Sequence, residues 1–137
     1  MHYSDDQIEI HKLVVGPYDN NVFVMRCRAT GDAVLLDAAN EVFYSAASIW
    51  EIAIKSALRR RDFKANPTVL VRALAQSGFS ELPVSATHAA RVAELPPIHR
   101  DPFDRLLVWQ SICQHLTLLS KDPDLRQYQP HGLHVLW

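Results

Sequence analysis

The stretch Val42–Lys55, with the sequence VFYSAASIWEIAIK, decides the fold that we expect for the rest of the chain. It predicts a buried strand over residues 42–46 that leads into a helix over residues 49–61, whose apolar residues recur at helical spacing. Ser48 and Glu51 stand three positions apart, which predicts a capping box with one carboxylate in the first turn of the helix. A strand end, a helix start and an acid therefore fall within a few residues.

The composition is that of one globular domain, because 48% of the 137 residues are apolar and 21% are charged. A formal net charge of −1 gives no overall field for nucleic acid, so such binding would need a local basic patch. No apolar run approaches the roughly 18 residues of a membrane span, and the first residues are acidic, which predicts a cytoplasmic protein with no membrane partner. Cys27 and Cys113 are expected to be buried free thiols.

The residues before the opening stretch predict strands and no helix. Residues 8–15 and 22–28 alternate or run apolar in the manner of strands, and turn-forming residues separate them. A second turn precedes the apolar residues 33–36. Together the three segments predict an antiparallel β meander.

Strands alternate with helices after residue 42. The predicted order continues with a helix opened by Asn66 and ended by Gly78, a strand at 79–84, a helix from Ser85 or Thr87 through Ala93, a long helix at 102–115, a strand at 116–119, a short helix through Tyr128 and a strand at 134–137. The long helix is apolar nearly all round and is expected to be central. This alternation predicts an α/β fold with a mostly parallel sheet covered on both faces.

Carboxylates follow expected strand ends or open expected helices. Glu51 follows the first of these strands, Asp122 follows strand 116–119, and Asp104 begins the long helix with Asp101 beside it. The carboxyl ends of parallel strands form the ligand crevices of open α/β sheets, so we expect the acids to converge. Mg²⁺ or Mn²⁺ would relieve their mutual repulsion and could activate water for phosphodiester cleavage. Taken singly, each acid is better explained as a helix cap.

Four longer segments carry more information than the single acids: SAASIWEIAIK, FSELPVSATHA, LPPIHRDPFDRLLVWQS and LTLLSKDPDLRQY, with HVLW closing the chain. They resemble the PIN-domain ribonucleases, specifically the VapC-type toxins of type II toxin–antitoxin pairs, over about residues 41–137. The resemblance implies a three-layer fold and a Mg²⁺- or Mn²⁺-dependent endoribonuclease that is inhibited by an antitoxin protein and is usually a homodimer. By position, the second, third and fourth acids of the family fall on Glu51, Asp104 and Asp122, with Asp101 as a further candidate ligand.

The front of the chain departs from that family. PIN domains open with a strand that ends in an aspartate, followed by about two helices, and this pattern is not found before residue 42. Residues 7–39 instead resemble the opening strands of metallo-β-lactamase-fold hydrolases, although the HxHxDH zinc motif of those enzymes is absent. We therefore divide the chain into a β extension at residues 1–40 and a truncated PIN-like domain at residues 41–137.

Asp37, which ends the segment VLLD, is not expected to replace the missing aspartate. Only residues 38–41 separate it from Val42, whereas a parallel crossover needs a dozen or more residues. We expect the two strands to be continuous or antiparallel, which places Asp37 at the end of the sheet away from Glu51. A cluster of three acids would bind metal less tightly.

Other side chains carry weaker signals. His99 and Arg100 are expected in an exposed loop that precedes the long helix. Trp50 and Trp109 stand at helical spacing from apolar neighbours, which favours core or dimer contacts over base stacking.

A run of basic residues ends the first helix. Arg59, Arg60 and Arg61 are candidates for contacts with RNA phosphates, and a solvated helix end explains them equally well. Three functions stay open: a weakened or inactive VapC-like ribonuclease, a non-catalytic PIN-like module that binds an antitoxin, and a recombined gene product without a settled function.

Overall fold

The computed structural model describes residues 3–4, 8–15, 20–27, 33–37, 41–58 and 65–136, and it describes side chains for Ser4, 41–58 and 65–136. The chain divides into two compact units. The first unit combines Met1–Tyr44 with Ile49–Leu82, and the second unit combines Ser45–Ser48 with Pro83–Trp137. The domain boundary expected near residue 40 stays a prediction.

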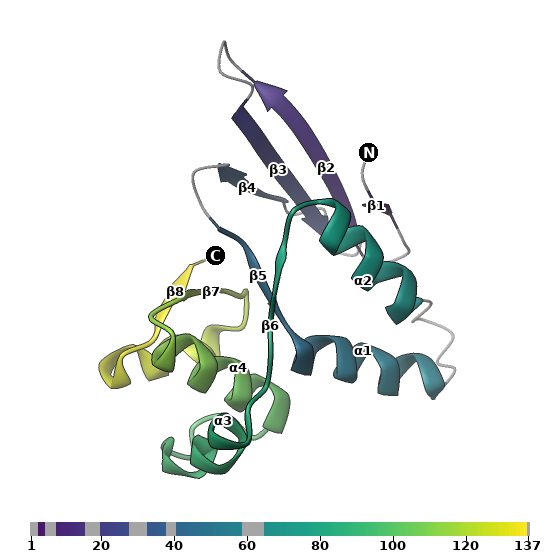
Figure 1. Cartoon of the computed structure of the whole chain (residues 1–137). Coiled ribbons are helices and arrows are strands. Elements are labelled where there is room, and N and C mark those ends of the chain that lie inside the picture. The colour runs from purple at the N-terminus through teal and green to yellow at the C-terminus, as the bar shows by residue number, and fades with distance from the viewer. Residues whose placement is uncertain are drawn as a thin grey trace. The chain divides into compact units, whose positions relative to one another are not determined.

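The N-terminal strands form an antiparallel sheet of four strands in the order β1-β2-β3-β4 (Figure 1). Its strands are β1 (Tyr3–Ser4), β2 (Ile8–Val15), β3 (Asn20–Cys27) and β4 (Ala33–Asp37). Ile8 pairs with Cys27 and Val15 with Asn20, so β2 and β3 form a hairpin without a bulge in its register. Strands β3 and β4 are also antiparallel. The predicted meander is therefore confirmed.

Strands β4 and β5 belong to different sheets. Strand β5 (Phe43–Ser45) pairs with β6 (Ser80–Leu82), whereas β4 pairs with β3. The backbone N–H of Ser80 donates to the carbonyl of Val42 at 2.8 Å, so the later strand supplies the partner of this segment. The expectation that residues 33–37 and 42–46 are continuous or paired is wrong for this reason. The side chain of Asp37 lies outside the described residues.

Helix α1 (Ala46–Ala57) begins three residues earlier than predicted. The hydroxyl Oγ of Ser45 accepts a hydrogen bond from the backbone N–H of Ala47 at 3.1 Å, so Ser45 supplies the first side-chain acceptor. Ser48 and Glu51 consequently lie inside the helix, and the predicted capping box is wrong. Glu51 instead pairs with Lys55 one turn later, at 2.5 Å.

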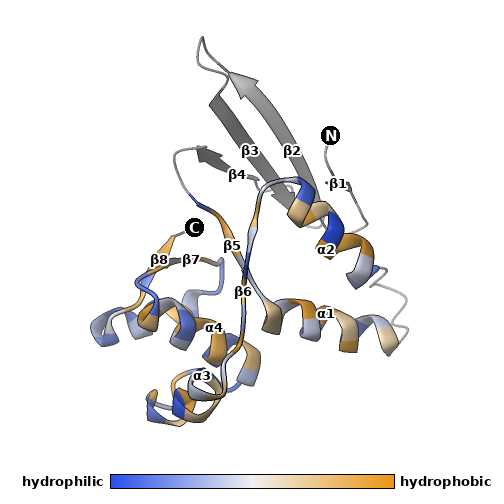
Figure 2. Cartoon of the chain, in the orientation of Figure 1, coloured by the Kyte–Doolittle hydropathy of each residue, from blue (hydrophilic) through white to orange (hydrophobic). Residues whose placement is uncertain are grey.

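The first unit has a small apolar core built on helix α2 (Pro67–Gln76). The side chain of Asn66 accepts from the N–H groups of Thr68 and Val69, which confirms the predicted start of the helix. The buried residues are Leu70, Ala73, Leu74 and Phe79, against which Val42, Tyr44, Ile49 and Ile52 pack. Val69 is 49% exposed because it lies off the face formed by positions 70, 73 and 74. Figure 2 shows strongly polar and strongly apolar residues together along α2, as expected of a half-buried helix.

The second unit follows the predicted alternation of elements. It contains α3 (Ala86–Arg91), the 3₁₀ helix η1 (Val92–Glu94), α4 (Pro102–Cys113), β7 (Thr117–Leu119), the 3₁₀ helix η2 (Pro123–His131) and β8 (His134–Leu136). Strands β7 and β8 are parallel. The fold is therefore α/β, as predicted, but the described strands after residue 41 form two pairs, β5-β6 and β7-β8, rather than one sheet.

Helix α4 is the centre of the second core. Val108 and Gln110 are fully buried, and the apolar cluster consists of Leu95, Val108, Leu125, Tyr128 and Leu133. Gln110 is satisfied although it is polar, because its Oε1 accepts from the Ser45 hydroxyl at 2.6 Å and its Nε2 donates to the Pro83 carbonyl at 3.1 Å. These two hydrogen bonds connect Ser45, which precedes α1, and Pro83, which follows β6, to α4.

Three predictions of burial have different outcomes. Trp109 packs against the second core, with the Arg91 guanidinium 5.2 Å from the centre of its ring, as predicted. Trp50 is 62% exposed, so it is not a core residue, and the other alternative that was predicted for it, a dimer contact, stays a prediction. Cys113 is free but exposed, because it is the last residue of α4 and points away from the face that carries Val108. Among the described residues, no helix has the length and apolar character needed to cross a membrane.

Candidate metal centre

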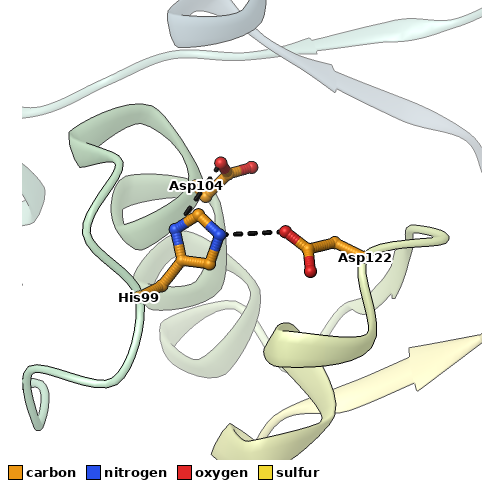
Figure 3. A group of neighbouring side chains, drawn as sticks. All are labelled: His99, Asp104 and Asp122. Atoms are coloured by element: carbon orange, nitrogen blue, oxygen red, sulfur yellow. Dashed lines mark hydrogen bonds and ion pairs between the residues drawn. The ribbon is translucent and has the colours of Figure 1, made fainter.

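Three side chains of the second unit meet at one point, as Figure 3 shows: His99, Asp104 and Asp122. The imidazole of His99 lies between the two carboxylates. Its Nε2 is 2.9 Å from Oδ2 of Asp122, and its Nδ1 is 3.6 Å from Oδ2 of Asp104. One ligand atom from each residue lies within 4.8 Å of the others, so a single small cation can reach all three.

The start of α4 places Asp104. Asp101 is the N-cap, and its Oδ1 accepts from the backbone N–H groups of Phe103 at 2.8 Å and Asp104 at 3.4 Å. Pro102 stands at the first helical position, where its missing N–H costs nothing. Asp104 therefore lies in the first turn. Asp101 caps α4, as the sequence predicted, and its further role as a metal ligand stays a prediction.

The start of η2 places Asp122 in the same way. Oδ1 of Asp122 accepts from the N–H of Asp124 at 2.9 Å, while Oδ2 faces His99. The backbone N–H of Asp122 in turn donates to the Ser120 hydroxyl at 3.2 Å. The two expectations for this residue, a cap and a site acid, are therefore compatible, because each uses a different oxygen.

The backbone of His99 is held on both sides. Its N–H donates to the hydroxyl of Tyr128 at 2.9 Å, and its carbonyl accepts from Nη1 of Arg105 at 3.5 Å. Tyr128 is fully buried, and its own hydroxyl donates to the carbonyl of Pro96 at 3.1 Å. The imidazole therefore projects from a segment that is fixed to the core.

Arg105 fixes the rest of the segment that leads to His99. Its Nη1 donates to the carbonyl of Pro96 at 2.9 Å and lies 3.3 Å from the Tyr128 hydroxyl. Its Nη2 donates to the carbonyls of Val92 and Leu95 at 3.2 and 3.1 Å. A planar guanidinium with several donors can join so many acceptors at once, which an ammonium group cannot do. Because Arg105 follows Asp104 directly, the same turn of α4 carries a site acid and the residue whose hydrogen bonds hold the segment that leads to His99.

The charges of the cluster stabilise one another. Burial of the ring tends to lower the pKa of His99, but its hydrogen bond to Asp122 and the charges of Asp104 and Asp122 outweigh that effect and raise its pKa. The N–H of Asp124 lowers the pKa of Asp122, burial opposes this, and His99 lowers it further. In the absence of metal, a proton on His99 offsets one of the two negative charges of Asp104 and Asp122.

His99 is the site residue that the sequence prediction missed. The expectation of an exposed loop is wrong for it, since 14% of its side chain is exposed, whereas Arg100 is exposed as expected. His99 and Asp104 are five positions apart in the sequence, which gives a signal of proximity, but the contact with Asp122 spans 23 positions and depends on the fold. An open pocket of about 590 Å³ beside the cluster is lined by Ile98, His99, Arg100, Asp101, Pro102 and Asp124.

The other predicted site residues lie elsewhere. Glu51 belongs to the first unit, where its carboxylate contacts Lys55, and its membership of the site stays a prediction. Arg59, Arg60 and Arg61 lie outside the described residues, so their predicted contact with substrate is a prediction as well. The structure brings together Asp104 and Asp122, two of the three predicted acids.

The donor set suits a divalent cation. Carboxylate oxygens are ligands for Mg²⁺ and Mn²⁺, and imidazole nitrogen is accepted by Mn²⁺ and the later transition ions. Asp104 and Asp122 are both partly exposed at their helix starts, so an ion could reach them from solvent. The residues present therefore fit a metal, with His99, Asp104 and Asp122 as the group that would hold it.

The comparison with known families agrees with this arrangement. The sequence profile of the PIN domain matches residues 19–129. No curated protein and no solved structure gave a significant match. PIN domains are generally metal-dependent nucleases and typically use a divalent metal. Since the match covers far more than half of the 137 residues, the chain belongs to the PIN domain family.

Proposed function

We propose that this chain is a VapC-like, Mg²⁺- or Mn²⁺-dependent endoribonuclease of the cytosol whose activity is weak. The observation that carries the proposal is the meeting of His99, Asp104 and Asp122 in a chain of the PIN domain family. Asp104 and Asp122 are the positions that resemble the third and fourth acids of the VapC-type toxins. Glu51 is proposed as a further ligand and Asp101 as an additional one.

Weak activity follows from the missing first aspartate. The sequence before residue 42 lacks the opening pattern of a strand-end aspartate followed by about two helices, and we propose that Asp37 does not take the place of that aspartate, so that one negative charge of the site is lacking. Fewer carboxylates hold a cation less tightly and fix its position less well. We expect slow cleavage that requires a high concentration of metal.

The roles of the residues follow from their charge and position. Asp104 and Asp122 provide negative oxygens that attract a cation, and their helix starts keep the two carboxylates in place. A bound divalent ion would supply Lewis-acid activation of water and of the scissile phosphate. Arg100 lines the pocket beside the cluster and is a candidate for contact with the RNA backbone, together with Arg59, Arg60 and Arg61.

An RNA cleavage assay with and without metal tests the proposal. Purified protein should cleave RNA slowly with Mn²⁺ or Mg²⁺ and not at all with EDTA. The variant Asp104→Asn should abolish cleavage, whereas Glu94→Gln, at an exposed acid of the same unit that does not line the pocket, should leave it largely unchanged. Cleavage that persists in EDTA would contradict the proposal. Brisk cleavage that Asp104→Asn abolishes would contradict only the proposed weakness.

A second candidate function is a non-catalytic module that binds an antitoxin-like protein or forms a homodimer. The observation that favours it is an exposed apolar row at positions i, i+4 and i+8, formed by Trp50 and Ile54 on α1 and by Leu58, which follows α1 directly and donates its N–H to the Ile54 carbonyl. Such a row on one helix face is typical of contact with a partner. Binding of a partner in EDTA with no RNA cleavage under any metal condition would select this function. In that case Trp50→Ala should weaken binding.

A further inference from the structure

We propose that His99 is itself a ligand of the metal, so that the centre is a mixed nitrogen–oxygen site rather than an all-carboxylate one. This inference rests on the proposed metal dependence and deepens it. Within the described residues of the second unit, Asp104 and Asp122 alone would supply two protein ligands to a shared ion. The imidazole of His99 is the third donor in reach.

The distances between the donor atoms fit a shared ion. Two ligands that each lie about 2.1 Å from one ion are separated by roughly 3.0 to 3.4 Å in octahedral or tetrahedral geometry. Nε2 of His99 is 2.9 Å from Oδ2 of Asp122, and Nδ1 is 3.6 Å from Oδ2 of Asp104. Only the first separation joins atoms that would coordinate through Nε2, and it is that of neighbouring ligands. A donor oxygen of Asp104 lies within 4.8 Å of the donor atoms of the other two residues, and a movement of this side chain would bring it to the ion.

The surroundings of the ring suit coordination through Nε2. A ligating histidine usually donates its other ring N–H to a carboxylate or carbonyl group. Nδ1 of His99 accepts a hydrogen bond from the backbone N–H of Asp101 at 3.2 Å, and the Asp104 carboxylate, which could accept a proton from Nδ1, lies 3.6 Å away. Coordination through Nε2, beside Asp122, requires the ring proton to lie on Nδ1. The Asp104 carboxylate can accept a hydrogen bond from it there, and the hydrogen bond from the Asp101 N–H is given up.

The position of His99 is fixed before any metal binds. The ring is largely buried, and two backbone hydrogen bonds determine where it projects: the N–H of His99 donates to the Tyr128 hydroxyl, and its carbonyl accepts from Arg105. A ligand that is held in place loses little conformational freedom on binding. This distinguishes His99 from His131 and His134, which are exposed at the surface.

The chemical consequence is a preference among metals. Imidazole binds Mn²⁺ and the later divalent transition ions better than it binds Mg²⁺, which favours oxygen alone. We therefore expect Mn²⁺ to bind the centre more tightly than Mg²⁺. Replacement of His99 should reduce that difference, because the remaining donors are oxygens.

Pulsed electron paramagnetic resonance of the full chain with Mn²⁺ tests the inference directly. The spectrum should show coupling of Mn²⁺ to a nitrogen nucleus, and labelling of histidine with ¹⁵N should change that coupling without any substitution. His99→Gln should remove the nitrogen coupling and weaken Mn²⁺ binding about tenfold or more, with a smaller effect on Mg²⁺. The matched control His134→Gln, at an exposed histidine of β8, should preserve both.

The outcomes separate this inference from the proposed nuclease function. Bound Mn²⁺ without nitrogen coupling, or coupling that survives His99→Gln in a variant with unchanged circular dichroism, would overturn the inference and leave the nuclease proposal standing. Nitrogen coupling in a protein that cleaves no RNA would support His99 as a ligand and count against the nuclease. The absence of any Mn²⁺ binding at millimolar concentration would overturn the inference whatever the cleavage assay shows.

Discussion

The hydroxyl of Tyr128 connects the core of the second unit to the candidate metal centre. It accepts from the N–H of His99, donates to the carbonyl of Pro96 and lies beside Nη1 of Arg105. The ring is fully buried among apolar residues, so its packing and its hydrogen bonds can be separated by one substitution.

Tyr128→Phe should destabilise the chain by about 1 to 3 kcal/mol, because it leaves the N–H of His99 without its partner while preserving the buried ring. Urea denaturation measures the change. Tyr44→Phe, which removes a hydroxyl in the first unit, is the control and should cost less. An effect of Tyr128→Phe no larger than that of the control would show that the hydroxyl does not hold His99.

The opposite pKa shifts of His99 and Asp122 predict how stability depends on pH in metal-free protein. The raised pKa of His99 means that its contribution is complete below the ordinary value of 6.5 and is lost as pH rises through the raised pKa. The lowered pKa of Asp122 means that its contribution is present above the ordinary value of 3.8 and is lost as pH falls through the lowered pKa. Stability should therefore be greatest between these two ordinary values.

Urea unfolding in EDTA at a series of pH values tests this dependence. His99→Gln should flatten the decline on the alkaline side, because the variant has no group that titrates there in contact with the acids. A decline of unchanged steepness in His99→Gln would assign the effect to another group.

The sequence identified the acids of the site better than it identified their neighbours. Asp104 and Asp122 were predicted because acids at helix starts form a local pattern, which a single segment displays. His99 was missed because its partners come from α4 and from η2, and only the folded chain brings them together. Glu51 shows the converse, since its predicted cap role depended on a helix start that Ser45 moves upstream.

At the scale of elements, the types were predicted well and the boundaries less well. Asn66 and Asp101 mark their helix starts where expected, because an N-cap side chain followed by proline is a strong local signal. The apolar run at 102–115 and the strand at 116–119 are also present. The two-residue strand β1 was not predicted, because so short a strand has no periodicity to detect.

The 3₁₀ helix η2 depends on the residue that ends it. Gly132 has φ +98° and donates its N–H to the carbonyl of Gln129. A Cβ at this position would meet Ile112 Cγ2 at 3.7 Å, an ordinary contact, so the obstacle to a side chain is the backbone conformation.

Gly132→Ala should therefore cost about 1 to 2 kcal/mol of stability, the usual penalty for an L-residue in the left-handed region. Thermal or urea denaturation measures it. Gln129→Ala, at an exposed position of the same element, should change stability little and serves as the control. A neutral effect of Gly132→Ala would indicate that the end of η2 can adopt another conformation.

At the scale of the whole molecule, each compact unit has its own apolar cluster. Among the side chains that the structure describes, every member of the two clusters lies between residues 42 and 135. The PIN domain match begins at residue 19, upstream of the boundary that we predict near residue 40. Whether residues 19–40 are needed for folding is thus a question that a truncation can answer.

A chain that begins at Glu41 should retain helical circular dichroism and unfold cooperatively, since both described clusters are kept intact. Far-UV circular dichroism during urea denaturation measures this. The complete chain is the reference. A truncated chain that is aggregated or molten would show that the front strands are part of the same folding unit, against the predicted division.

The double use of Asp122 has a consequence for how such a chain would change over generations. One carboxylate oxygen of Asp122 accepts the hydrogen bond that caps η2, and the other faces His99. Selection for a stable fold would therefore remove mutations at this position even after selection for RNA cleavage had ceased. Asp101 is protected in the same manner by its hydrogen bonds to the first turn of α4. A descendant that had lost its nuclease activity would keep these acids long after a residue such as Glu51, which the helix does not require for its start, had drifted. The survival of an acid in a PIN domain is therefore weak evidence of catalysis wherever that acid also caps a helix.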